Sequence, residues 1–268
     1  MNNSSEKNGK KLLKYLFPGL ITLLVMLIVL AAKGIWPFGS SRIDLFDNMQ
    51  QVAPLYAHLW DAMHGKADIW FDWYTALGTN VTMSMSAFSM LSPFNIFLYL
   101  CPRDYILEFI SILTVIKTFV MAVAMYAFIN RRYSGLSYRL KTLFATAYAF
   151  CGYVLLYASC FTPWMDIVAL FPLLMMALDI MEKTGKKLFY IIMVAVLFII
   201  NYYLAAMSLV YILLVGGMYL IFRCDRKERR EKAWNLGIGT FTGIALSAFM
   251  LIPVFAQLSQ SQRTGNTD

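Results

Sequence analysis

Groups that can take or give a proton gather in one stretch of the chain, between its first two long apolar runs. Seven of the fifteen acidic residues lie in or beside this stretch, and so do both histidines. They are Asp44, Asp47, Asp61, Asp68, Asp72, Asp104, Glu108, His58 and His64. Carboxylates and imidazoles serve as general bases, nucleophiles and metal ligands. If the protein carries out chemistry, we therefore expect it here.

Asp47 and Asp44 are the first candidates for such a role. They stand three residues apart, so they share one face if the local chain is helical. Two like charges placed there would need a cation or a shared proton. Pro54 predicts a kink, or a helix that starts near Ala53. A purely structural interpretation of Asp47, as the cap of that helix, stays open.

The segment from Asp47 to His64 carries two stripes at helical spacing. The apolar stripe holds Met49, Val52, Tyr56, Leu59 and Met63, and the polar stripe holds Asp47, Gln51, His58 and Asp61. This pattern is typical of an amphipathic helix that lies along a membrane surface.

Composition indicates that these candidates belong to a membrane protein. Of the 268 residues, 60% are hydrophobic and 14% are charged, and the mean hydropathy is +0.62. This content is too apolar for a disordered chain, and four cysteines are too few for a disulfide scaffold. Basic residues of multi-span proteins collect in cytoplasmic loops. The net charge of +8 therefore does not predict nucleic acid as a partner.

The apolar runs predict an all-α, polytopic membrane protein with about seven transmembrane helices. The expected spans are 15–32, 106–129, 142–160, 167–181, two within 188–222 that turn near Asn201, and 236–258. Seventeen of the 23 basic residues fall on one side of this arrangement and five on the other. Because Lys and Arg concentrate on the cytoplasmic side, residues 1–14 are expected inside, and residues 33–105 and 259–268 outside.

Two parts of this arrangement need interpretation. The apolar stretch 83–100 is almost long enough to cross, but it contains Pro93 and would turn the later basic loops outward. We interpret it as a re-entrant or interfacial element of the long first outer loop.

Lys117 lies near mid-membrane in the second span, with Glu108 or Asp179 as its expected partner. A functional role and structural pairing stay equal alternatives for this charge.

Three ordered motifs in the outer loop resemble those of a known family, the bacterial multi-pass membrane proteins called YfhO. Trp36-Pro37-Phe38-Gly39 is followed, eight residues past the glycine, by Asp47 in Asp47-Asn48-Met49-Gln50-Gln51-Val52-Ala53-Pro54. Ala76-Leu77-Gly78-Thr79-Asn80 and Ser92-Pro93-Phe94-Asn95 come next. Val52 stands where the family often has Tyr, and Ala76 where it often has Gly.

The resemblance implies a glycosyltransferase of the GT-C architecture in the bacterial plasma membrane. Such an enzyme moves a sugar on the outer face, from a polyprenyl-phosphate-linked donor to an envelope polymer such as teichoic acid. The implied base or metal ligand is Asp47, with Asp44 as its substitute. Gln51, His58, Arg42, Lys66, Asn80 and Arg103 are the implied substrate-binding residues, the three basic ones facing the lipid phosphate or anchoring at headgroups. No cofactor is certain, and a divalent Mg²⁺ or Mn²⁺ ion on Asp47 is the one to consider.

Length separates this chain from the family pattern, because family members are normally several times longer. Residues 15–258 are therefore expected to form the N-terminal transmembrane domain of a longer protein, and the chain is expected to be truncated and inactive by itself.

Two other classes of function stay open. A transporter or lipid flippase would have its path lined by Lys117, Glu108 and Asp179. The spans show no internal repeat, and Asn201-Tyr202-Tyr203 is the only candidate for a broken helix. A non-catalytic membrane assembly factor is the third reading.

Overall fold

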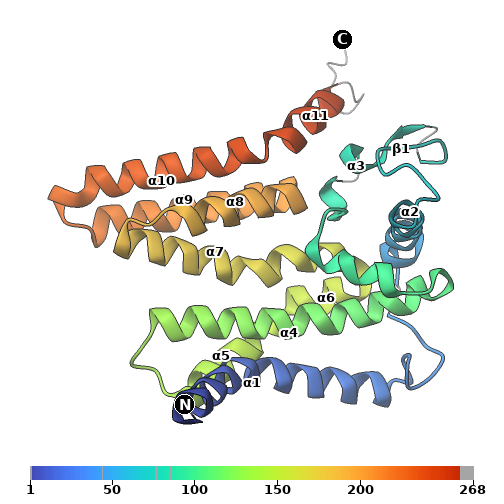
Figure 1. Ribbon diagram of the computed structural model, residues 1–268, viewed down its shortest axis with the longest axis horizontal. Coiled ribbons are helices and arrows are strands. Elements are labelled where there is room, and N and C mark those ends of the chain that lie inside the picture. The colour runs from blue at the N-terminus through green and yellow to red at the C-terminus, as the bar shows by residue number, and fades with distance from the viewer. Residues whose placement is uncertain (1, 44, 76–77, 85, 260–268) are drawn as a thin grey trace. The chain divides into compact units, whose positions relative to one another are not determined.

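The computed structural model describes residues 2–43, 45–75, 78–84 and 86–259, most of which are helical (Figure 1). The longer helices are α1 (Asn2–Ala32), α2 (Ala53–Met63), α4 (Ile106–Arg132), α5 (Tyr138–Ala149), α6 (Gly152–Cys160), α7 (Met165–Thr184), α8 (Leu188–Ile200), α9 (Tyr202–Phe222), α10 (Arg226–Leu246) and α11 (Ala248–Ser259). The short elements are the π-helix η1 (Asn48–Val52), α3 (Val81–Ser84), the 3₁₀ turns η2 (Ser86–Phe88), η3 (Pro93–Leu100), η4 (Arg103–Tyr105) and η5 (Thr162–Trp164), and the antiparallel strands β1 (Phe71–Asp72) and β2 (Thr79–Asn80). The prediction of an all-α, polytopic membrane protein is confirmed.

Five helical stretches of the described chain are long and apolar enough to cross a membrane. They are Gly9–Ala32, Arg103–Arg132, Tyr138–Cys160, Thr162–Thr184 and Tyr202–Phe222. A sixth candidate is formed by α10 with α11, two helices that meet at an angle of 71°. The predicted span within α8 is helical but has 13 residues, about 20 Å at 1.5 Å per residue. The short α8 is why length supports five or six spans and not seven.

Several helices extend beyond the predicted spans at their polar ends. α1 begins at Asn2 and α10 at Arg226, well before their apolar runs. The charged residues at the start of α10 are good helix formers, and apolar content alone does not detect a helix that continues into water.

The chain forms two compact units, Met1–Pro54 with Leu100–Met176 and Leu55–Tyr99 with Ala177–Asp268. The boundaries fall within α2, near the end of η3 and within α7.

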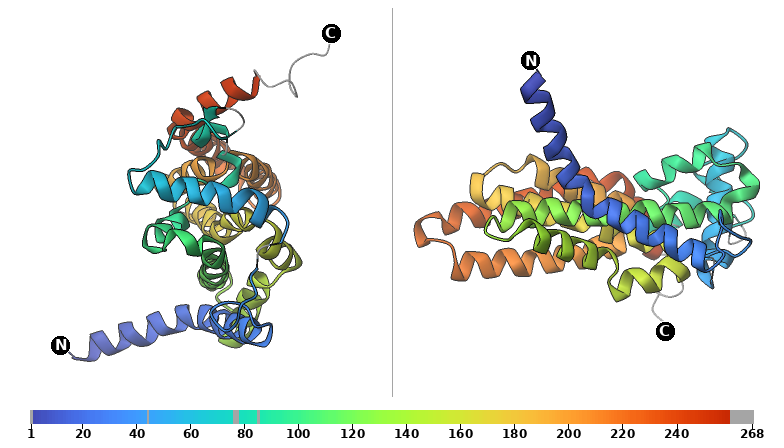
Figure 2. Two further views of the ribbon diagram at one scale, coloured as in Figure 1. Left: turned by 90° about the vertical axis from the view of Figure 1, so that its right-hand side faces the viewer. Right: turned by 90° about the horizontal axis from the view of Figure 1, so that it is seen from below.

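In the first unit, α1 packs closely on α4, while its first turns extend past α4 and α5 (Figure 2). A Cβ at Gly19 would lie 2.7 Å from Val123 Cγ2, so only glycine permits this approach. Asn130 joins three helices, because its Nδ2 donates to Tyr15 Oη (2.8 Å) and its Oδ1 accepts from Lys141 Nζ (2.9 Å).

In the second unit, α8 packs on α10 along the two glycines of Gly239-x-x-x-Gly243. A Cβ at Gly243 would lie 2.6 Å from Val194 Cβ, and one at Gly239 would lie 2.9 Å from Tyr190 Cδ1. The Tyr190 hydroxyl forms a buried hydrogen bond of 2.9 Å with Thr240 Oγ1.

The stretch 83–100 also belongs to the second unit, and it does not form a single spanning helix. It contains the 3₁₀ turns η2 and η3. Asn201, at the break between α8 and α9, donates from Nδ2 to the carbonyl of Ala87 (2.6 Å), while its Oδ1 accepts from Leu204 N–H (3.0 Å). The segment thus reaches the α8–α9 junction, and its re-entrant or interfacial placement in a membrane stays a prediction.

Candidate functional site

Asp47 lies in the first unit at the residue just before the π-helical turn η1. It is half-buried, and Oδ1 of its carboxylate accepts a 2.7 Å hydrogen bond from Gln51 Nε2. Its side chain makes no capping bond to a backbone N–H of the helix. The interpretation of Asp47 as a side-chain helix cap therefore finds no support in this geometry.

Pro54 explains why the π-helical turn η1 forms directly after Asp47. Because proline has no N–H, the carbonyl of Gln50 receives no α-helical bond from it. Ala53 N–H bonds to Asn48 O, the five-residue spacing of a π-helix, and α2 begins at Ala53 as predicted. Such one-turn π segments are frequent at functional sites.

The extra residue in the turn changes which side chains are buried. Val52, Tyr56 and Leu59 are buried as the apolar stripe predicts, but Met49 is 51% exposed and Asn48 is buried in its place. The stripe from Met49 was therefore wrong at its first member, because a 3.6-residue period does not hold across a π-helical turn.

Asn48 fastens the segment around Asp47 to the end of α6. Its Nδ2 donates to Ser159 O (2.9 Å) and Ala158 O (3.2 Å), and its Oδ1 accepts from Thr162 N–H (2.8 Å). Leu45 N–H also donates to Ser159 O, at 3.0 Å. Polar backbone groups left at the end of α6 are thereby satisfied by one side chain.

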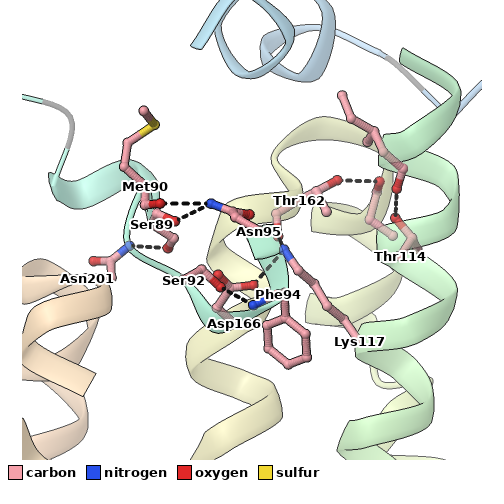
Figure 3. A network of polar contacts seen from close by, with 12 residues as sticks. Ser89, Met90, Ser92, Phe94, Asn95, Thr114, Lys117, Thr162, Asp166 and Asn201 are labelled. Atoms are coloured by element: carbon pink, nitrogen blue, oxygen red, sulfur yellow. Dashed lines mark hydrogen bonds and ion pairs between the residues drawn. The ribbon is translucent and has the colours of Figure 1, made fainter. Parts of the chain in front are cut away.

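Lys117 pairs with Asp166. The expected pairing with Glu108 or Asp179 was wrong. Its Nζ lies 2.5 Å from Asp166 Oδ1 and donates to Thr162 O at 3.0 Å, and both charged side chains are fully buried (Figure 3). Asp166 is the partner because α7 starts beside the middle of α4, so its first turn faces Lys117.

The other two expected partners have their own cations. Glu108 Oε1 lies 3.4 Å from Arg42 Nε, and Asp179 Oδ1 lies 2.8 Å from Lys183 Nζ, one turn along α7.

The remaining predicted residues of the first unit lie near the surface. Arg42 is exposed beside Glu108, Gln51 is exposed beside Asp47, and Arg103 is exposed at the start of η4. Asp44 lies outside the described residues.

The second unit holds the other predicted substrate-binding residues. His58 is half-buried on α2, and its Nε2 is buried without a hydrogen bond to any described residue. The ammonium of Lys66 lies 4.5 Å from the centroid of the Trp60 ring, a cation–π contact. Asn80 is half-buried and pairs with Phe71 across the two strands.

Asp72 lies on strand β1, and the pKa of its carboxyl group is lowered from its ordinary value. The chief cause is a 2.6 Å hydrogen bond from Thr75 Oγ1, and the backbone N–H of Tyr74 also donates to the carboxylate. Both bonds favour the charged form.

The described residues do not form a metal site. No three side chains of His, Cys, Asp or Glu in this part of the chain are placed to hold an ion. The described partner of Asp47 is an amide N–H donor, which does not fit beside a cation. A divalent ion on Asp47 stays a prediction, because Asp44 lies outside the described residues.

Two motif positions have structural roles. A Cβ on Gly39 would collide with the carbonyl of Gly34, so the turn of Trp36-Pro37-Phe38-Gly39 requires glycine. Asn95 is buried and donates to the carbonyls of Ser89 (2.9 Å) and Met90 (3.0 Å) (Figure 3). Residues 76 and 77 of the middle motif lie outside the described part.

Sequence reasoning missed three residues of the site, namely Asn48, Thr162 and Asp166. A signal existed for Asp166, because it is an acidic residue at an apolar run and a lysine inside a span requires a countercharge. No signal existed for Asn48 and Thr162, since their contacts join backbone groups far apart in the chain.

Comparison with known proteins identifies the family. Residues 19–268 match the family described as bacterial membrane protein YfhO. No curated protein matches the chain, and no solved structure does. The match covers the loop that carries Asp47 and all of the candidate spans beyond it. The chain therefore belongs to the YfhO family of bacterial membrane proteins.

Proposed function

We propose that the protein acts in the transfer of a sugar from a polyprenyl-phosphate-linked donor to an envelope glycopolymer, with Asp47 as general base. The observation that carries the proposal is the Asp47 carboxylate, which is half-buried at the start of a π-helical turn and lies on a segment fastened to α6. A fixed carboxylate that stays accessible is what proton abstraction from a hydroxyl requires.

The proposed step is a substitution at the anomeric carbon. The acceptor hydroxyl oxygen forms a bond to that carbon, its proton passes to the Asp47 carboxylate, and the bond from the carbon to the phosphate oxygen breaks. Polyprenyl phosphate leaves with the bonding electron pair. The developing phosphate charge is stabilised by cations, and Arg42 and Arg103 are exposed basic residues of the same unit.

The proposal places Asp47 on the outer face of a bacterial plasma membrane, with the N-terminus in the cytoplasm and the C-terminus outside. The excess of Lys and Arg in the segments assigned to the cytoplasm supports this orientation. Met49 provides a direct test because its side chain is half exposed. A cysteine at position 49 is expected to react with a membrane-impermeant maleimide in intact cells, and reaction only after the cells are opened would reverse the orientation.

The reaction is tested by Asp47→Asn in the full-length protein, expressed in a strain that lacks its own copy of the gene. Removal of a general base is expected to lower sugar addition by about 10²- to 10⁴-fold, with an unchanged amount of protein in the membrane. Asp104→Asn is the matched control, since Asp104 is an exposed carboxylate at the end of the same loop. Sugar on the isolated envelope polymers is measured, and full modification by the Asp47→Asn protein would refute the role of Asp47.

Transport of a lipid or solute is the second candidate, and the buried Lys117–Asp166 pair is the observation that favours it. Movement of a polyprenyl-phosphate sugar across liposomes by the purified protein, without a new glycosidic product, would support transport over transfer. The proposed path of Lys117, Glu108 and Asp179 has little support, because each has a different partner.

A further inference from the structure

The ion pair of Lys117 and Asp166 sits where two helices of the first unit meet. Lys117 lies eleven residues past the start of α4, and Asp166 is the second residue of α7. The ammonium contacts Asp166 Oδ1 at 2.5 Å and the carbonyl oxygen of Thr162 at 3.0 Å, and both side chains have no exposed surface (Figure 3). A buried charge is costly unless it is paired, so the lysine fixes the turn η5 against α4.

Lys117 and Asn48 both bind the turn η5, through the backbone of Thr162. Thr162 accepts from Lys117 through its carbonyl and donates through its N–H to Asn48 Oδ1, at 2.8 Å. A continuous line of contacts therefore runs from Asp166 through Lys117 and Thr162 to Asn48, the residue that follows Asp47.

The backbone around Asp47 is held on both sides. Leu45 and Asn48 both bond to Ser159 O. Between them, Phe46 has a φ of +50°, a left-handed conformation that is unfavourable for a bulky side chain. Such strain persists only where the surroundings fix the backbone, and it concentrates at functional sites.

We infer that the Lys117–Asp166 ion pair and Asn48 are positioning residues that hold the Asp47 carboxylate in register for proton transfer. This inference rests on the proposed function. A displacement of about 1 Å in a reacting group costs on the order of 100-fold in rate. Loss of the ion pair is therefore expected to lower kcat strongly while KM for the lipid-linked donor changes little.

A double-mutant cycle separates positioning from general stability. The probe is a polyprenyl phosphate carrying a tritiated hexose or N-acetylhexosamine, supplied with envelope polymer to the purified full-length protein in liposomes. Asp47→Asn is combined with Asn48→Ala and with Lys117→Met/Asp166→Asn, which removes both charges and leaves no buried ion unpaired. Lys232→Met/Glu228→Gln, which removes an i,i+4 pair on α10, is the matched control.

Positioning predicts strong non-additivity. Asp47→Asn is expected to cost at least about 100-fold by itself and less than about tenfold when Asn48 or the ion pair has already been changed. With the α10 control pair changed, its full cost is expected to remain. Equal costs in all backgrounds would overturn the inference, since a merely structural role leaves the effect of Asp47→Asn unaltered. Lys117→Arg keeps the cation, so it is expected to retain part of the kcat that Lys117→Met/Asp166→Asn loses.

Hydrogen exchange tests the mechanical link without any activity. The amides of Leu45 and Thr162 are bonded in this network, and we expect them to exchange at least about tenfold faster in Lys117→Met/Asp166→Asn. Unchanged exchange would overturn the inference even if Asp47 is essential. Faster exchange together with a fully active Asp47→Asn protein would instead refute the proposed function and, with it, the purpose of the positioning.

Discussion

Lys117→Met is expected to destabilise the protein strongly, because it leaves the carboxylate of Asp166 buried without its cation. Both side chains are fully buried and their charged atoms are 2.5 Å apart. Removing one partner of such a pair costs about 3–5 kcal/mol. The hydrogen bond from the ammonium to Thr162 O is lost as well, and bonds of charged donors contribute about 1.5–3 kcal/mol.

The double variant separates these two contributions. Lys117→Met/Asp166→Asn loses the hydrogen bond to Thr162 but leaves no uncompensated charge, so we expect a cost of about 1.5–3 kcal/mol. This is smaller than the cost of Lys117→Met alone and far below the roughly 6–10 kcal/mol that two independent single changes would give.

Unfolding in mixed micelles with increasing sodium dodecyl sulfate, followed by fluorescence of the six tryptophans, measures these free energies. Lys232→Met is the control, because the Lys232–Glu228 pair is partly exposed and is worth about 0.3–0.5 kcal/mol. A double variant that is less stable than Lys117→Met, or a Lys117→Met protein as stable as wild type, would refute the reasoning from burial.

Two further predictions concern packing and pH. Gly243→Ala places a Cβ 2.6 Å from Val194 Cβ and 3.0 Å from Ile191 O, so we expect a loss of about 1–3 kcal/mol in the same unfolding assay. Gly237→Ala, with no atom within 4 Å of its Cβ, should gain roughly 0.5–1 kcal/mol, and equal effects at the two glycines would contradict the α8–α10 packing. Thr75→Ala removes the main cause of the lowered pKa of Asp72, so this pKa should rise. The stability that ionised Asp72 contributes is present at neutral pH and is lost as the pH falls through the lowered pKa. In the variant, this stability would be lost at a higher pH. Carbon-13 NMR titration of the carboxyl group measures the pKa, and an unchanged value would contradict this assignment.

The spanning helices could be predicted because apolar content over about 20 residues is a property of the local sequence. The start of α2 at Ala53 was predictable for the same reason, since Pro54 acts on its own neighbours. The partner of Lys117 could not be read in this way. It depends on the level at which α7 begins beside α4, which is set by packing and not by the residues near Lys117.

Asp47 was proposed from its type and motif, whereas the role of its neighbour Asn48 in fastening this segment to the end of α6 was not predicted. Asn48 lies in a segment where a π-helical turn shifts the side chains by one position, so the helical period assigned Met49 to the buried face. Its three bonds go to backbone groups of residues 158, 159 and 162. Because every residue has these backbone groups, the sequence does not indicate which of them Asn48 contacts. The contacts are identified only in the three-dimensional structure.

The shortness of α8 affects the lipid around it. Its 13 residues cover about 20 Å, whereas the hydrocarbon layer is about 30 Å thick. Asn201 ends the helix with a bond to the carbonyl of Ala87, which belongs to the segment 83–100. Membranes of short-chain lipids should therefore suit this part of the protein better than thick ones, and bilayer thickness becomes a physical variable to which it responds.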